Sequence, residues 1–103
     1  MAKNYVNEVV NLAKENENFR QVLFTTDLSQ LVLMSVEPGD DIGEEVHDGI
    51  DQILSFVSGT GRAVLDGAES EIRAGSVVVV PGGVKHNFIN TGGEPLKLYT
   101  VYT

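Results

Sequence analysis

The segment at residues 75–90 constrains the fold of this chain more than any other part of it. It consists of a run of four valines, a Pro-Gly-Gly turn and a histidine, His86, three residues after the turn. An apolar β-branched run bounded by Gly and Pro predicts a buried strand. Because the turn residues reverse the chain, we expect His86 to return close to the end of that strand. The only other histidine, His47, lies in an acidic, glycine-containing segment upstream, and the two histidines suggest a shared site.

The composition limits the classes of protein to which the chain can belong. With 103 residues we expect one domain, which buries about two-thirds of its unfolded surface. The absence of cysteine excludes disulfides and thiolate metal ligands. The formal net charge of −8 argues against a nucleic-acid or anionic-lipid partner, because both require clustered Lys and Arg. No apolar run is long enough to span a membrane and no signal sequence is recognisable, so we expect a cytoplasmic protein.

The rest of the chain is predicted to contain one helix and a series of short strands. Residues 4–16 carry an apolar stripe at helical spacing. Beyond them, short apolar segments alternate with Gly-containing turns, of which Asp66-Gly67 is the clearest hairpin turn. This pattern predicts an all-β barrel or sandwich at residues 19–103, with residues 1–18 as the helix and its lead-in. The predicted strands are residues 19–26, 30–36, 51–57, 61–65, 68–73, 76–80, 86–90 and 96–102.

Four polar side chains can converge on one point if the two histidine segments meet inside one barrel. Residues two apart in a strand point to the same side, so Glu45 and His47 project together. Gln52 and His86 each stand near the start of a predicted strand. Two imidazoles with one carboxylate form the facial arrangement of non-haem iron sites, which leaves positions open for substrate. A set of nitrogen and oxygen ligands without sulfur suits Mn, Fe, Ni or Zn.

The spacing of these residues resembles the two sequence motifs of the cupin superfamily, whose members are small jelly-roll barrels. The first motif, G-x5-H-x-H-x3,4-E-x6-G, is matched by Gly39, His47 and Gly59. The resemblance implies an all-β double-stranded β-helix with a short N-terminal α-helix. Small cupins are often labelled phosphomannose isomerase-like, but resemblance at the level of the fold does not define a function. The second motif, G-x5-P-x-G-x2-H-x3-N, is matched at every position by Gly75, Pro81, Gly83, His86 and Asn90.

The first motif departs from the cupin pattern at two positions. Glu45 stands where the first histidine is expected, and Gln52 stands where the glutamate is expected. The carboxylate charge is therefore kept but moved to another ligand position. Asp51 is an alternative ligand at the shorter permitted spacing, but Gln52 keeps six residues before the motif's final glycine. The resemblance implies a divalent transition metal bound by Glu45, His47, Gln52 and His86.

The pocket around this metal is predicted from strand residues that face inward. Arg62, Arg73 and Lys85 are the cations considered for contact with an anionic substrate, although each is also explained as a surface charge that offsets the acidic excess. The sequence identifies neither the substrate nor a catalytic residue. The predicted lining residues are Met34, Leu54, Phe56, Phe88 and Tyr99.

Three functions agree with such a site. The first is a metalloenzyme of dioxygenase or isomerase type that acts on a small polar molecule, with Glu44 or Asp51 as the general base. The second is a non-catalytic barrel that binds or senses a small ligand through its metal, and in the third the metal is only structural. The cupin resemblance also implies a homodimer. The chain ends at Thr103, directly after the last predicted strand, which predicts an open barrel mouth or a segment beyond this end.

Overall fold

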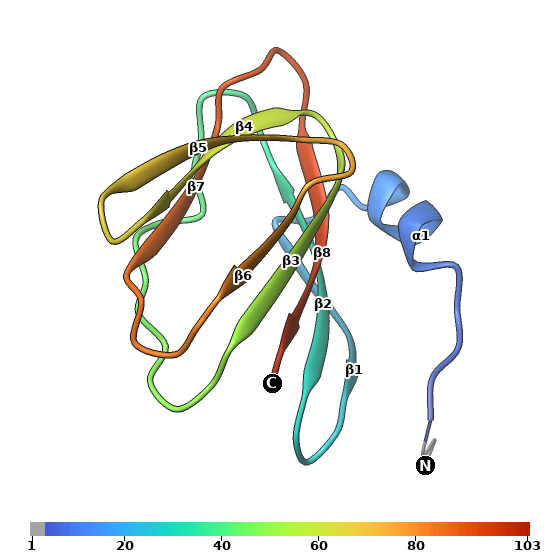
Figure 1. The fold of residues 1–103 in the computed structure, drawn as a ribbon. Coiled ribbons are helices and arrows are strands. Elements are labelled where there is room, and N and C mark those ends of the chain that lie inside the picture. Colours follow the sequence, from blue (N-terminus) through green and yellow to red (C-terminus); the bar gives the residue numbers. More distant parts are fainter. Residues whose placement is uncertain (1–3) are drawn as a thin grey trace.

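The computed structural model describes residues 4–103, which form one short helix and eight strands arranged as a jelly roll of two facing sheets (Figure 1). The predicted all-β fold is confirmed. All eight predicted strands are present, and their ends differ from the prediction by at most one residue. Residues 1–3 of the predicted lead-in lie outside the described residues. The elements are α1 (Val9–Glu15), β1 (Arg20–Thr25), β2 (Gln30–Val36), β3 (Gln52–Ser58), β4 (Thr60–Leu65), β5 (Ala68–Arg73), β6 (Val77–Val80), β7 (His86–Asn90) and β8 (Leu96–Tyr102).

The two sheets are antiparallel, and their strand order brings distant parts of the sequence together. One sheet has the order β1-β2-β8-β3-β6, and the other has the order β5-β4-β7. The segment between β2 and β3 runs beside β7, because Asp41 forms a bridge with Ile89 and Glu45 forms one with His86. The two histidine segments therefore lie side by side in the second sheet.

Apolar side chains from both sheets fill the space between them. Along β3, β7 and β8, five successive residues alternate between buried and half-buried, because residues two apart share a face. Phe56 from β3 and Phe88 from β7 meet across the barrel with ring centroids 5.7 Å apart. The core cluster consists of Val32, Met34, Val36, Leu54, Phe56, Ala63, Ile72, Val80, Phe88, Leu96 and Leu98.

The helix is shorter than the apolar stripe at residues 4–16 predicts, because it begins at Val9. The four residues upstream, Asn-Tyr-Val-Asn at 4–7, are all poor helix formers. Tyr5 instead packs against Phe24 of β1, with ring centroids 5.3 Å apart. A tertiary contact therefore replaces the first predicted helical turns. No helix within residues 4–103 combines the length and apolar character needed to cross a membrane.

Lys97 of β8 connects the C-terminal end of α1 to the five-stranded sheet. Its Nζ donates hydrogen bonds to the backbone carbonyls of Lys14, at 2.9 Å, and Asn16, at 2.8 Å. The last carbonyls of a helix have no partner within the helix, and a cation there also interacts favourably with the helix dipole. The helix therefore packs on the outer face of this sheet, away from the barrel interior (Figure 1).

Candidate metal centre

A two-way backbone bridge places Glu45 beside His86. The Glu45 N–H donates to the His86 carbonyl and the His86 N–H donates to the Glu45 carbonyl, each at 2.9 Å. Directly opposite residues of an antiparallel pair project their side chains to the same face. His47 follows Glu45 by two residues and joins the same group, as its position in the sequence predicts.

The turn before His86 is tied to the segment that carries His47. The Gly83 N–H donates to the His47 carbonyl at 2.8 Å, and the Gly82 N–H donates to the Asp51 carboxylate at 2.9 Å. Gly83 has a φ of 86°, a left-handed conformation that glycine adopts without strain. These contacts fix the positions of the two histidines relative to each other through the backbone.

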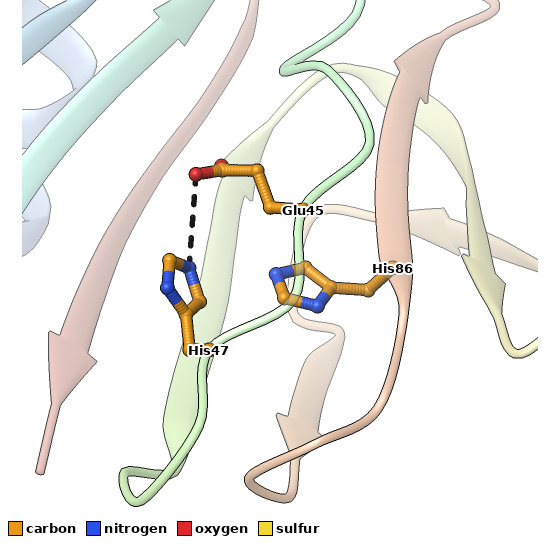
Figure 2. Close-up of side chains that lie close together, drawn as sticks. All are labelled: Glu45, His47 and His86. Carbon is orange, nitrogen blue, oxygen red and sulfur yellow. Dashed lines mark ion pairs between the residues drawn. The ribbon is translucent and has the colours of Figure 1, made fainter.

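The side chains of Glu45, His47 and His86 converge, with one ligand atom from each residue within 4.8 Å of the other two (Figure 2). The ring centroids of the two histidines are 5.2 Å apart, and His47 Nε2 is 3.8 Å from Glu45 Oε2. Metal–nitrogen and metal–oxygen bonds are about 2.0–2.2 Å long for zinc. Atoms this close together can therefore contact one cation.

Unpartnered buried atoms test whether these residues fit a metal. Among the described residues, four buried side-chain atoms have no hydrogen-bond partner: His47 Nε2, His86 Nε2, Gln52 Oε1 and Ser35 Oγ. Leaving such an atom unpaired costs about 1–3 kcal/mol. Three of the four belong to the predicted ligand set, and imidazole nitrogen and amide oxygen are both metal-ligand atoms. The residues present therefore fit a divalent metal.

The orientation of His86 suits a metal ligand. Its Nδ1 lies 2.8 Å from the carbonyl of Val84, and because a carbonyl only accepts, Nδ1 carries the proton and donates it. The lone pair of the neutral imidazole is then on Nε2, the atom without a partner. A backbone carbonyl that holds the second ring nitrogen is the usual support of a metal-binding histidine.

The contacts of Asp51 and Gln52 distinguish the two alternatives for the fourth ligand. Asp51 is exposed, and its carboxylate accepts the Gly82 N–H. Gln52 is only 4% exposed, and its Nε2 donates to Thr100 Oγ1 at 3.0 Å. Thr100 Oγ1 in turn donates to the carbonyl of Ile53, which fixes the direction of the Gln52 amide. Gln52 Oε1 has no hydrogen-bond partner among residues 4–103, which makes Gln52 the better candidate.

Substitution of these two residues should give opposite results. We expect Gln52→Ala to weaken metal binding by about 100-fold or more, because removal of a group that only supports a ligand already weakens it by about 10- to 100-fold. Asp51→Ala should leave the metal content unchanged, because its carboxylate contacts the turn instead. Metal content per chain after dialysis, measured by atomic emission, checks both variants. Loss of metal in Asp51→Ala alone would assign the ligand to Asp51.

The cavity beside the three converging side chains differs from the predicted pocket. The structure places Met34, Leu54, Phe56 and Phe88 in the closed core between the sheets, where they are at most 3% exposed. None of them lines the cavity, which has a volume of about 300 Å³. Their inward direction is as predicted, but aliphatic and aromatic neighbours cover them. The cavity is lined by Arg20, Gln30, Glu45, His47, Ile50 and Tyr102.

Tyr99 lies on the outer face of the sheet, where it lines a cavity beneath the helix with Val10 and Lys14. The physical reason is the alternation along β8, in which Leu98 and Thr100 are buried on the inner face. The tyrosine that shares the inner face is Tyr102, three residues further on. Its ring meets the His47 ring edge-on, with centroids 5.5 Å apart.

Four of the six residues that line the cavity are missing from the sequence-based prediction: Arg20, Gln30, Ile50 and Tyr102. The alternation from Leu96 along β8 is a signal that could have placed Tyr102 inward, whereas no local pattern marks Arg20. Burial raises the pKa of the Tyr102 hydroxyl, and the charge of Arg20 works against this rise. The negative charge of Glu45 raises the pKa of Tyr102 further.

The cations considered from the sequence lie elsewhere. Arg62 forms an ion pair with Glu69 at 3.1 Å, and Lys85 lies 3.9 Å from Glu44. Arg73 lines a separate cavity that shares no residue with the one beside His47. These three residues therefore do not supply the positive charge at the candidate metal centre.

A jelly-roll barrel in which two histidines and a carboxylate converge is the arrangement of a small cupin. The family model described as a cupin domain matches residues 32–102, and the chain belongs to this family. The matched region begins within β2 and includes both histidine segments.

Several known proteins are similar to this chain in sequence or in fold. The Bacillus subtilis protein YrkC is 38% identical over an alignment of 106 positions that covers 97% of this chain and 57% of YrkC. A solved Bacillus halodurans structure is 35% identical with a TM-score of 0.95, covering 97% of this chain and 80% of that one. An oxalate-binding protein of Thermotoga maritima is 31% identical over 68 residues, 66% of this chain and 56% of that protein. The chain spans little more than half the length of these two curated relatives.

Proposed function

We propose that this protein holds a divalent transition metal through Glu45, His47, Gln52 and His86 and uses it to bind a small polar molecule. The observation that carries this proposal is the convergence of ligand atoms from Glu45, His47 and His86. The Nε2 atoms of both histidines are buried and have no hydrogen-bond partner among the described residues. A cavity of about 300 Å³ adjoins them, which is at the small end of the range for ligand sites. When bound, the metal supplies a Lewis acid with positions open to a ligand.

Binding without turnover is the function that the residues support best. A general base must lie within hydrogen-bond reach of the proton that it removes. Of the two residues considered for this role, Glu44 faces Lys85 and Asp51 holds the turn at Gly82. Among the described residues that line the cavity, the only carboxylate belongs to Glu45, which is itself in the ligand group. The name of the Thermotoga relative, an oxalate-binding protein, agrees with a binding role.

Removal of the metal tests the proposal directly. We expect the purified protein to hold about one metal ion per chain and to lose thermal stability when a chelator is added. A ligand present at 100 times its Kd stabilises the folded state by about 2.7 kcal/mol. For a domain of this size that energy corresponds to a shift in Tm of roughly 10–20 °C. A protein without metal, whose Tm a chelator does not change, would contradict the proposal.

The second candidate is a metalloenzyme of dioxygenase or isomerase type, which the two histidines and one carboxylate favour. Oxygen uptake and product analysis with a panel of small hydroxy and oxo acids separate the two functions. Turnover that requires the metal would favour the enzyme, whereas a ligand that raises the Tm without turnover favours the binding protein. The homodimer implied by the cupin resemblance stays a prediction.

A further inference from the structure

Arg20 brings a positive charge to the wall of the cavity beside Glu45 and His47. Its Nη2 donates to Gln30 Oε1 at 3.0 Å, across the pair formed by β1 and β2. This partner is neutral, and Arg20 forms no ion pair with another residue in the described part of the chain. A guanidinium has five N–H donors, so the contact with Gln30 orients the group and leaves both charge and donors for a ligand.

The charges at the site favour an anion. A divalent metal carries two positive charges, and Glu45 offsets one of them, because the histidines and Gln52 are neutral ligands. The Arg20 guanidinium adds a positive charge at the same cavity. The chain as a whole has a formal charge of −8, but salt screens exposed charges beyond about 8 Å. With a divalent metal bound, the ion and the charged residues that line the cavity would therefore carry a net positive charge.

Tyr102 adds a hydrogen-bond donor to the same wall. Its ring is held against His47, and its hydroxyl interacts with Arg20. A tyrosine hydroxyl has an ordinary pKa of about 10, so it carries a proton to donate at neutral pH. A fork-shaped guanidinium with an adjacent hydroxyl matches the two oxygens of a planar carboxylate.

We propose that Arg20 selects a small carboxylate as the ligand of this site, with the carboxylate held by Arg20 and a second oxygen donor of the ligand directed to the metal position. This inference rests on the proposed metal-binding function and names the class of its ligand. The cavity of about 300 Å³ is at the small end of the range for ligand sites, which favours a small ligand. Arg20 is the specificity-determining residue, and Gln30 is a positioning residue that holds it.

Oxalate and its neutral diamide, oxamide, test the requirement for a carboxylate. We expect the metal-loaded protein to bind oxalate at least about 10-fold more tightly than oxamide in calorimetry at fixed salt, because hydrogen bonds between charged groups are stronger than neutral ones. Arg20→Gln should weaken oxalate binding by about 10- to 100-fold while the metal content stays that of the wild type. Arg20→Lys keeps the positive charge but lacks the planar pair of N–H donors of the guanidinium, so it should give an intermediate affinity for oxalate.

Arg62→Gln is the matched control, because Arg62 faces Glu69 away from the cavity and its loss should not change oxalate binding. Wild-type affinity for oxalate in a metal-loaded Arg20→Gln protein would overturn the proposal and leave the metal function intact. The same holds if oxamide or inorganic phosphate binds as tightly as oxalate. A wild-type protein that takes up no metal would overturn both proposals. Metal content measured in every sample keeps these outcomes distinct.

Discussion

Replacing His86 by alanine should remove stable metal binding from a barrel that still folds. The substitution deletes one of two imidazoles and the Nε2 atom that faces the site without a partner. Loss of a group that only supports a ligand weakens metal binding by about 10- to 100-fold, so we expect the loss of a ligand to exceed about 100-fold. Metal content after dialysis and the shift in Tm on adding metal measure the effect.

Two further variants complete this test. Lys85→Ala alters the neighbouring, exposed residue and should keep the metal content of the wild type. Glu45→Gln removes the carboxylate charge from a half-exposed side chain, so it should weaken metal binding without disturbing the core. Circular dichroism verifies that each variant is folded. A folded His86→Ala protein with a full complement of metal would show that the ion is bound elsewhere.

Replacing Phe88 by alanine should destabilise the protein by about 3–5 kcal/mol, the range for large aromatic residues in cores. The Phe88 side chain is fully buried, and its ring centroid lies 5.7 Å from that of Phe56 and 6.0 Å from that of His86. Domains of this kind have total stabilities of about 5–15 kcal/mol, so the loss is a large share. Urea denaturation followed by circular dichroism measures it.

The matched control for this variant is Val79→Ala, because Val79 is 56% exposed on β6. Its expected effect lies within about 0.5 kcal/mol, as for most surface substitutions. We also expect Phe88→Ala to weaken metal binding, because the Phe88 ring supports one side of the His86 imidazole. Similar stabilities for the two variants would contradict the view that the barrel is held together by contacts between its two sheets.

The strands were predictable from the sequence because their signals are local. Each is a short apolar run between turn residues, and alternation along the run sets which residues face inward. The start of the helix was not predictable in this way, since the contact between Tyr5 and Phe24 joins residues that no local pattern connects. Glu45 and His47 were placed on one face by their spacing alone, and the backbone bridge to His86 then completed the group.

Most of the residues that line the cavity, unlike the strands, were not predictable from local sequence signals. A buried strand residue and a cavity-lining residue have the same pattern in the sequence, so Leu54 and Phe88 could not be separated from Tyr102 by alternation. Arg20 reaches the site only because β1 pairs with β2 at the edge of the five-stranded sheet. Its role depends on the register between strands, which the residues next to Arg20 in the sequence do not indicate.

The motif at residues 75–90 by itself determined that a strand and a turn precede His86, because glycine, proline and β-branched residues restrict the backbone locally. The prediction that this strand is buried was wrong, because β6 lies at the edge of its sheet with Val77 and Val79 exposed. Only the tertiary structure decided what His86 meets. The pairing of Glu45 with His86, the buried oxygen of Gln52 and the charge of Arg20 come from three different parts of the chain. They are brought together by strand pairing over long sequence separations, which local preferences do not specify.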